Sequence, residues 1–439
     1  RLCVQRCVGK RQVMISAVLM GAFLLLIIID VPISLALLGG SMVAMVVMGS
    51  SLSPAAQSMI ATVDSFALLA IPLFIAAGDL MNRGGITTRL VDLSHALVGH
   101  IRGSLAQTGV VAATLFGSVS GSAVADTAAV GSAIIPQMVK QGYDRAFSAA
   151  LIATAGTLGM LMPTSITLVI FALTANVSIA KLLLAGLIPG ILISAMLCIY
   201  CYVYALRRGL AAGSTFSLRR LLRALANAVV PAITPAIIVT GIVGGVFTPT
   251  EAGAVAVVYA TFIGVFVYRE LDLKGILESA IHTSLITGLV MFLIFTSFAF
   301  SWVITLDRVP ETFAAYLING TNSPLVVFLL MNLFLLAIGT FLDPTPTILI
   351  TVPIFLPIAV QFGIDPIHFG IVFAINMAIA QVSPPAGAPL FTACGIAGVS
   401  MAQVTPPIIP LIGVLLLSLV ISILAPSLIL FLPNLILAK

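Results

Sequence analysis

The sequence predicts an all-α polytopic membrane protein built from two inverted-topology repeats, each with a re-entrant hairpin and a broken helix. Hydrophobic residues make up 61% of the chain and charged residues only 8%, whereas a soluble domain has roughly 25% charged residues. The apolar runs are long and do not alternate, which favours membrane-spanning helices over the strands of a barrel. A chain of 439 residues has room for about ten to twelve hydrophobic passes.

An internal repeat falls on the least regular hydrophobic segments. An offset of 221 residues (357 minus 136) aligns Pro136 with Pro357 without a gap. The same offset aligns four more pairs of identical residues: Gly142 with Gly363, Asp144 with Asp365, Pro163 with Pro384, and Pro189 with Pro410. Two membrane half-repeats with Gly and Pro interruptions at matching places are typical of secondary transporters, in which the interruptions mark the binding site.

The first scaffold segment is expected at 14–102. Residues 1–13 are basic and precede Met14, which has the character of a natural start, so we interpret 1–13 as an N-terminal extension that need not be native. Three spans and an amphipathic arm are predicted in the scaffold segment: 14–29, 31–50, 65–81 and 86–101.

The segment 103–206 is expected to form the transport domain of the first repeat. Residues 104–139 are apolar but are interrupted by Gly117-Ser118-Val119-Ser120-Gly121-Ser122, and each half is too short to span a bilayer. We therefore expect a re-entrant hairpin, whose non-helical tip requires protein or a water-filled cavity around it. A helix broken near Gly156–Pro163 and a full span complete the segment, at 144–175 and 178–206.

A basic loop at 207–224 divides the two repeats. It holds five arginines and no acidic residue, so the positive-inside rule places it in the cytoplasm. The second scaffold segment is predicted at 225–323, with spans at 225–246, 250–268 and 281–304 and an amphipathic stretch at 307–320. The second transport domain is predicted at 324–433, with a hairpin at 325–362, a broken helix at 366–396 and one last span at about 405–433.

The passes counted from the basic loop set the orientation of the two repeats. An odd number of passes lies between the hairpins, so the halves are inverted. The first hairpin then opens toward the cytoplasm and the second toward the outside.

Hairpin tips and helix breaks expose backbone carbonyls, amides and hydroxyls near the bilayer midplane. Carbonyls and hydroxyls suit Na⁺, and half-helix N-termini suit a carboxylate. The first predicted sodium site pairs the first tip with the first break: Ser118, Ser120, Gly121, Ser122, Gly156, Pro163 and Thr164. The second pairs the second tip with the second break: Gly339, Thr340, Asp343, Ser383, Pro384 and Gly387. For any single serine, close helix packing is a better explanation than ion binding. The clustering of small and polar residues at repeat-equivalent places favours ion binding for the group as a whole.

Six residues are predicted to contact the substrate: Ser122, Asp126, Ser165, Thr345, Pro385 and Asn376. Asp126 is an intramembrane acid, which is costly and usually functional, although helix capping near the tip is an alternative. For Asp343, capping is a stronger alternative because Pro344 follows it. Asn376 and Gln381 are polar groups in a broken-helix segment, and for each an interhelical hydrogen bond is as good an explanation as substrate contact.

Several functions are disfavoured. The net charge of +5 lies in loops and reports orientation, so no nucleic-acid binding is expected. The sequence holds no P-loop and no constellation of catalytic side chains, so we expect neither an enzyme nor a cofactor other than sodium ions. An uncoupled channel or facilitator on the same fold remains the alternative, and saturable, sodium-dependent flux would distinguish the two.

Long motifs resemble the large membrane subunit of tripartite ATP-independent periplasmic (TRAP) transporters. They are LFGSVSGSAVADTAAVGSAIIPQM at 115–138, TPTEAGAVAVVYA at 248–260 and GIDPIHFGIVFAINMAIAQVSPPAGAPLF at 363–391. The similarity covers nearly the whole chain from about residue 14. Where members of the family often carry Pro-Pro-Ser in the first break, this chain has Met162-Pro163-Thr164-Ser165.

The resemblance implies an elevator-type fold, like that of the ion transporter superfamily, and sodium-coupled import of an organic acid. Sialic acid, a C4-dicarboxylate and a sugar acid are all open as substrates. It further implies two partners, a small four-helix membrane subunit and a periplasmic substrate-binding protein. The expected location is the lipid bilayer of the bacterial inner membrane.

Overall fold

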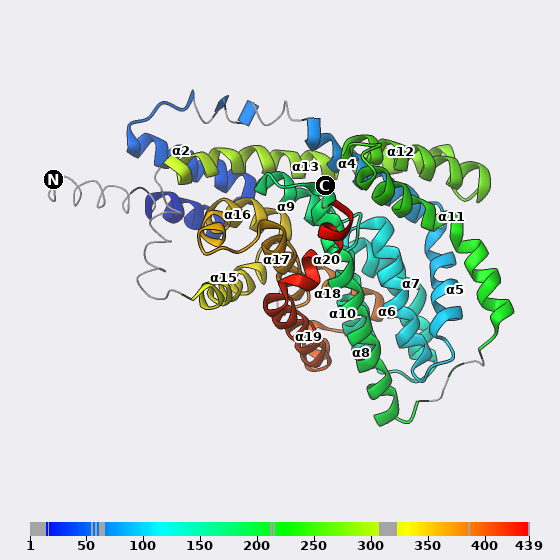
Figure 1. The fold of residues 1–439 in the computed structure, drawn as a ribbon. Coiled ribbons are helices and arrows are strands. Elements are labelled where there is room, and N and C mark those ends of the chain that lie inside the picture. Colours follow the sequence, from blue (N-terminus) through cyan, green and yellow to red (C-terminus); the bar gives the residue numbers. More distant parts are fainter. Residues whose placement is uncertain are drawn as a thin grey trace.

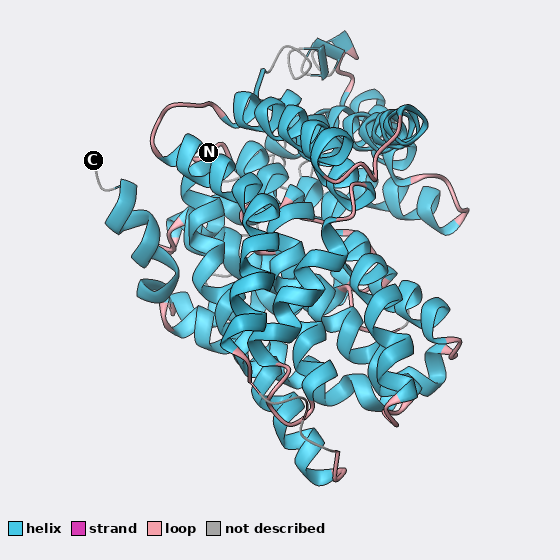
Figure 2. Cartoon of the chain, turned by 90° about the vertical axis from the view of Figure 1, so that its right-hand side faces the viewer, coloured by secondary structure: helices cyan, strands magenta, loops and turns pink. Residues whose placement is uncertain are grey.

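The computed structural model describes residues 15–437 except for 16, 54–55, 58, 61–65, 211–212, 214–215, 307–322 and 385–386. Throughout this part of the chain the regular structure is helical, without a β-strand (Figure 2). Seven of the described helices are long and apolar enough to cross a membrane. The predicted all-α polytopic membrane fold is thereby confirmed. The predictions for 1–13 and 307–320 lie outside the described residues.

Residues 17–98 contain three apolar helices and an amphipathic one. They are Ala17–Ile28, α2 (Ile33–Met48), α4 (Ala70–Arg83) after a 3₁₀ turn at Phe66–Leu69, and α5 (Ile86–Val98). Helix α5 buries Leu90 and Leu93 and leaves Asp92 exposed. This one-sided burial is the pattern expected of an amphipathic arm.

The first hairpin consists of α6 (Ser104–Ser120) and α7 (Ala123–Lys140). Two residues join the helices. Gly121 has φ +65°, a left-handed conformation that costs glycine little and other residues more. Ser122 then caps α7 by accepting the Ala125 N–H, which satisfies one of the free amides of the helix start.

The first broken helix consists of α8 (Arg145–Gly156), a 3₁₀ turn (Thr157–Met160) and α9 (Ile166–Ala175). Pro163 lies in the break, where its missing N–H and fixed φ oppose a continuous helix. The full span α10 (Ile179–Arg207) follows.

The second half repeats this order. Its helices are α11 (Leu218–Val243), α12 (Pro249–Phe262) running into a π-helix (Ile263–Val267), α13 (Leu273–Leu306), α15 (Pro324–Gly339), α16 (Pro344–Gln361), α17 (Pro366–Ala380), α18 (Ala388–Ala397), α19 (Met401–Leu424) and α20 (Pro426–Leu437). Helices α15 and α16 form the second hairpin, and α17 and α18 form the second broken helix.

Residues related by the offset of 221 have the same local structure. Gly142 and Gly363 both have positive φ, +88° and +76°. Asp144 and Asp365 follow within two residues and cap α8 and α17 with their carboxylates. The same offset aligns Ser122 with Asp343, the N-cap positions of α7 and α16.

The prediction of one last span at 405–433 is wrong. Helix α19 ends at Leu424 and α20 begins at Pro426. Between them Ala425 has φ −121° and ψ 68°, because the ring of a following proline disfavours the helical conformation of the residue before it. Pro426 itself suits the first turn of a new helix.

The two helices before the breaks form the centre of the molecule. All residues from Phe147 to Gly156 in α8 and from Ile367 to Ala380 in α17 are buried. A helix that is apolar on every side requires packing partners on every side, and α8 has them in α6, α7, α18 and α19. Figure 1 shows α13 extended along one edge of the molecule, where it packs on α2, α4 and α16.

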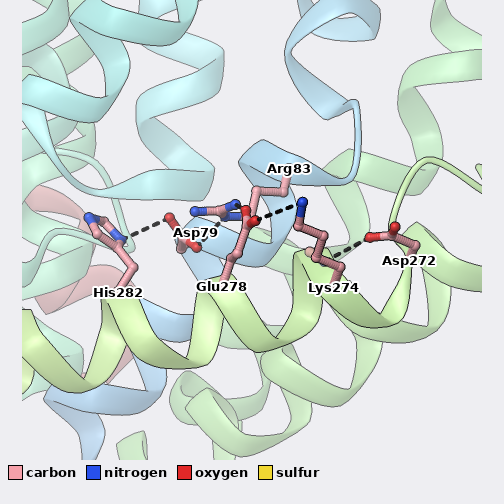
Figure 3. A network of polar contacts seen from close by, with 7 residues as sticks. Asp79, Arg83, Asp272, Lys274, Glu278 and His282 are labelled. Carbon is pink, nitrogen blue, oxygen red and sulfur yellow. Dashed lines mark hydrogen bonds and ion pairs between the residues drawn. The ribbon is translucent and has the colours of Figure 1, made fainter.

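A polar network joins α4 to the first turns of α13 (Figure 3). Asp79 accepts from Arg83 at 2.9 Å and pairs with His282 at 3.0 Å. Arg83 also pairs with Glu278 at 2.8 Å. Because Asp79 lies in α4 and Glu278 in α13, the network ties the two halves of the chain together.

Candidate transport site

A cavity of about 530 Å³ lies between the two hairpin tips. Gly121 and Ser122 line it from the first tip, and Asp343 and Thr345 from the second. Each broken helix also contributes residues, Met160, Ile166 and Thr167 from the first and Gln381 and Ala388 from the second. Helix α13 forms a wall of apolar side chains: Ile286, Leu289, Val290 and Leu293.

Four helices begin at this cavity. The first residues of α7, α9, α16 and α18 all line it, namely Ala123, Ile166, Pro344 and Ala388. A helix N-terminus carries free amide groups and a partial positive charge of about half a unit. Four such ends around one space favour an anionic group there.

The polar side chains that line the cavity are few. They are the hydroxyls of Ser122, Thr167 and Thr345, the Gln381 amide and the Asp343 carboxylate. No Arg, Lys or His is among the lining residues, which all belong to the described part of the chain. A bound carboxylate would therefore interact with backbone amides and hydroxyls.

The first tip is seated against the first break. The Thr164 hydroxyl donates to the Gly117 carbonyl at 3.1 Å. A Cβ added at Gly121 would collide with the Thr164 carbonyl oxygen, so this close approach requires glycine. The structure thus brings Gly121 and Thr164 of the first predicted sodium site together.

Asp126 lies behind the first tip and does not line the cavity. It is fully buried, and Ser120 donates its hydroxyl hydrogen to Oδ1. The other oxygen, Oδ2, has no hydrogen-bond partner among the described residues. It lies against Gly117 and Gly159, where an added Cβ would crowd it. The capping alternative is wrong for Asp126, since Ser122 caps α7.

The other residues of the first predicted site have local partners. Ser118 donates to the Leu115 carbonyl of its own helix at 2.6 Å. Gly156 packs closely against Thr127, where a Cβ would meet the Thr127 hydroxyl. Ser165, a predicted substrate contact, is buried, caps α9 through the Leu168 N–H and donates to the Met160 carbonyl.

A side-chain hydrogen bond joins the second tip to the second break. Gln381 Nε2 donates to Asp343 Oδ1 at 3.2 Å, and Gln381 Oε1 is buried without a partner among the described residues. Asp343 occupies the N-cap position of α16 but makes no capping hydrogen bond with its side chain, so the capping alternative is wrong here too.

The remaining residues of the second predicted site also have local partners. Thr340 and Ser383 donate to carbonyls one turn earlier in the chain, Leu336 and Ile379. Gly339 packs on α17, where a Cβ would crowd Ala380 and Met377, and Gly387 lies against the Gln381 carbonyl. Pro384 lies in the break, and Pro385 is outside the described residues.

Asn376 does not line the cavity. It is fully buried, and its amide nitrogen donates to the Asn332 carbonyl at 2.8 Å and to Asn332 Oδ1 at 3.0 Å. The interhelical alternative, between α17 and α15, is therefore the one the structure shows.

Two polar residues of the cavity are absent from the sequence-based sets. Gln381 is the last polar residue before the second break, and Thr167 stands two residues after Ser165 at the start of α9. Their position at the edge of a break is a signal that could have included them. The apolar wall of α13 carries no such signal, because a residue lining a cavity and one facing lipid look alike in sequence.

The fold is that of an integral membrane protein with a cavity between two hairpin tips. The chain belongs to the family described as "Tripartite ATP-independent periplasmic transporter, DctM component", whose sequence model matches residues 20–428. The resemblance noted from the motifs is thereby confirmed. The protein is a multi-pass component of a tripartite transport system in the bacterial inner membrane, and it is a permease and not an enzyme.

Relatives of known type match over most of the chain. The C4-dicarboxylate TRAP transporter large permease protein DctM of Pseudomonas aeruginosa is 39% identical over 397 residues, 90% of this chain and 93% of the relative. The sialic acid TRAP transporter large permease protein SiaM of Vibrio cholerae is 36% identical over 381 residues, 87% and 89% of the two chains. The crystal structure of the YdaH transporter of Alcanivorax borkumensis, described as having an unusual topology, shares the fold with a TM-score of 0.61 at 15% identity, over 85% of this chain and 87% of that one.

Proposed function

We propose that this chain is the membrane-transport subunit of a sodium-coupled, binding-protein-dependent importer of small organic acids. The observation that carries the proposal is the start of four helices at the cavity between the tips. These N-termini supply positive potential without a basic side chain, which suits a carboxylate that must be released again. The cavity, at about 530 Å³, is within the size range of sites for small molecules.

The substrate is a small organic acid such as a C4-dicarboxylate, sialic acid or a sugar acid. The named relatives support the first two classes. In our proposal Ser122 and Thr345 contact the substrate directly, since both line the cavity. Ser165 acts through the start of α9, Pro385 remains a predicted substrate contact, and Asp126 and Asn376 position the tip and the neighbouring helices.

Sodium is proposed at two places, one beside each tip. The first site uses the oxygen atoms around Asp126, with Ser120, Thr164 and the Gly117 carbonyl nearby. A fully buried carboxylate with an unpaired oxygen needs a cation or a proton to offset its desolvation. The second site uses Asp343 and the unpaired Gln381 Oε1. Carboxylate, hydroxyl and amide oxygens are the donors expected for a hard cation.

An elevator movement is proposed to carry the cavity across the membrane. The cavity lies between helices of the two transport domains and the apolar wall of α13. Displacement of the tips along this wall would change the side on which the cavity opens. It would do so without exposing the irregular backbone of the breaks to lipid.

Two partners complete the proposed system. A small four-helix membrane subunit would cover the exposed apolar side chains of α13, among them Leu273, Leu277 and Leu285. A periplasmic substrate-binding protein would capture the dilute acid and deliver it. The chain alone is expected to give little uptake.

The test is uptake of radiolabelled succinate or sialic acid into proteoliposomes that contain this chain, the small subunit and the binding protein. Saturable uptake that requires an inward sodium gradient supports the proposal. Linear, sodium-independent flux would favour the facilitator, and concentrative uptake by this chain alone would remove the tripartite interpretation.

The matched variants are Ser122→Ala in the cavity and Ser132→Ala, which is exposed on the same helix and bonds only to its own turn. Ser122→Ala should reduce uptake and Ser132→Ala should leave it unchanged. Equal uptake by the two variants would count against Ser122 as a contact.

A further inference from the structure

A second cavity, of about 660 Å³, shares no lining residue with the cavity between the tips. Three helices meet there: the first turn of α8, the last turns of α10 and the first turns of α19. The α10 end carries Arg207 and Arg208 and leads into the arginines of α11. The positive-inside rule places this end at the cytoplasmic face of the membrane.

The cavity is rich in hydrogen-bond donors. Two guanidinium groups line it, Arg145 from α8 and Arg208 from α10, together with the hydroxyl-bearing side chains of Tyr200 and Tyr204. The Arg208 guanidinium carbon lies 5.8 Å from the centre of the Tyr204 ring. That ring stacks on Phe147 with 3.7 Å between the ring centres. Arg208 therefore lies within cation–π range of an aromatic ring, a contact that arginine makes more often than lysine.

The other polar groups that line the cavity are already committed in part. Asp144 is the single acid among the lining residues, and its carboxylate accepts the Phe147 N–H at 2.8 Å as the cap of α8. Gln403 accepts the Ser400 N–H through Oε1 at 2.9 Å, which leaves its NH₂ group as a donor. The cavity is thus lined by two cationic side chains and by one carboxylate, which is already engaged as the cap of α8.

We propose that this cavity binds the phosphate group of an anionic phospholipid. Arginine pairs phosphate oxygens with two parallel N–H bonds, which a lysine does not do. Basic pockets between membrane helices at the cytoplasmic face suit anionic headgroups. The volume leaves space for the glycerol of a headgroup beside the phosphate.

The surface beside the cavity points to a lipid as the source of that phosphate. On α10, next to Tyr200 and Tyr204, the side chains of Ile199, Val203 and Leu206 are 64%, 38% and 43% exposed. They form an apolar strip along the helix that starts at the cavity. An acyl chain can lie on this strip while its headgroup phosphate meets the arginines. A free phosphate ion would make no use of the strip.

The test measures lipid binding to the purified full-length chain in detergent by native mass spectrometry. Phosphatidylglycerol, phosphatidylcholine and inorganic phosphate are titrated separately. The wild-type chain should prefer phosphatidylglycerol, and Arg145→Gln/Arg208→Gln should lower that affinity about tenfold, the effect of losing charge-assisted bonds worth about 1.4 kcal/mol. Affinity for phosphatidylcholine should not change.

The control is Arg219→Gln/Arg223→Gln, which removes the same charge from exposed positions of α11 that do not line the cavity. It should leave phosphatidylglycerol binding within about twofold, because surface charges that make no direct contact are largely screened. Arg145→Lys/Arg208→Lys keeps the charge and provides the comparison if the Gln variant does not fold. It should bind with an affinity between those of the wild-type chain and the Gln variant.

Three outcomes distinguish the possibilities. A loss of phosphatidylglycerol binding in the cavity variants, without a loss in the α11 control, supports the lipid site. Arginine-dependent binding of inorganic phosphate without a preference for phosphatidylglycerol keeps the anion site and makes its occupant a soluble anion. No preference among the lipids and no phosphate binding, or an equal loss in the α11 control, overturns the proposal.

Discussion

Gln381 and Asp343 are joined by a hydrogen bond of 3.2 Å between side-chain atoms of residues 38 positions apart. Asp343 is the N-cap residue of α16 at the second tip, and Gln381 directly follows the last residue of α17 before the second break. Both line the cavity. The bond therefore joins the tip to the break at the place where the substrate is proposed to bind.

Gln381→Ala should lower sodium-driven uptake about tenfold. The substitution removes both the hydrogen bond to the Asp343 carboxylate and the amide oxygen of the second proposed sodium site. Initial rates in proteoliposomes at saturating substrate provide the measurement. The matched control is Gln137→Ala, an exposed glutamine of α7 that bonds to the Ala133 carbonyl one turn earlier. Wild-type uptake by Gln381→Ala would exclude this bond from the transport cycle.

Sodium should stabilise the protein against thermal unfolding. A ligand that binds only the folded state adds about 2.7 kcal/mol when its concentration is about 100 times its dissociation constant. The experiment compares melting in detergent in NaCl, KCl and choline chloride at equal ionic strength. Asp126→Asn should shrink the sodium-specific shift, since it removes the charge of the buried carboxylate, whereas Ser132→Ala should keep it. Superimposable curves in all three salts would count against both sodium sites.

The glycine of the first tip offers a matched pair. Gly121 and Gly142 both have left-handed φ, +65° and +88°, so alanine at either position should cost about 1 to 2 kcal/mol of backbone strain. Only at Gly121 would the new Cβ also collide with a neighbour, the Thr164 carbonyl, whereas nothing lies within 4 Å at Gly142. Gly121→Ala should therefore lower the melting temperature more than Gly142→Ala does, and it should abolish uptake. Equal effects of the two substitutions would show that the contact between the first tip and the first break contributes little to stability.

The polar network of Figure 3 predicts an order of stability effects. Asp79 has two partners, Arg83 and His282, and its side chain is 13% exposed. Glu278 is 49% exposed, so solvent screens its pairing. Asp79→Ala should destabilise the chain by about 1 to 2 kcal/mol and Glu278→Ala by less than about 1 kcal/mol. Thermal melting of the two variants in the same detergent is the measurement, and the reverse order would contradict this account of the network.

The proposed movement predicts a change in the accessibility of the cavity. In a background without the native cysteines, a single cysteine replaces Ser122 or Thr345, which line the cavity from the two tips. Labelling by a membrane-impermeant reagent from each side should change reciprocally with sodium and substrate. Labelling from one side under all conditions would reject the elevator and favour a channel.

Glycine and proline made the fold and the region of the cavity between the tips predictable from sequence. The repeat that aligns Gly142 with Gly363 and Pro163 with Pro384 located the hairpins and breaks, because these residue types limit the backbone itself. Proline alone was insufficient at the end of the chain. Pro410 lies within α19, whereas Pro426 starts α20, and neighbouring helices decide which prolines a membrane helix tolerates.

Side-chain partners were less predictable than the backbone. Asn376 bonds to Asn332, 44 residues away, and no local pattern identifies such a pair. Leu289 of α13 lines the cavity and is still 74% exposed. In the sequence it therefore cannot be distinguished from a leucine that faces lipid. These relationships depend on the packing of distant helices, which the offset of 221 does not specify.

The four helix starts at the cavity have a consequence for how such a protein changes its substrate during evolution. Their positive potential comes from peptide groups, so no single side-chain replacement removes it and no change of pH near neutrality titrates it. Mutations in the walls, such as those of α13, can reshape the space while the attraction for an anion persists. A chain of this kind can drift from one acid to another through intermediates that all still bind an acid.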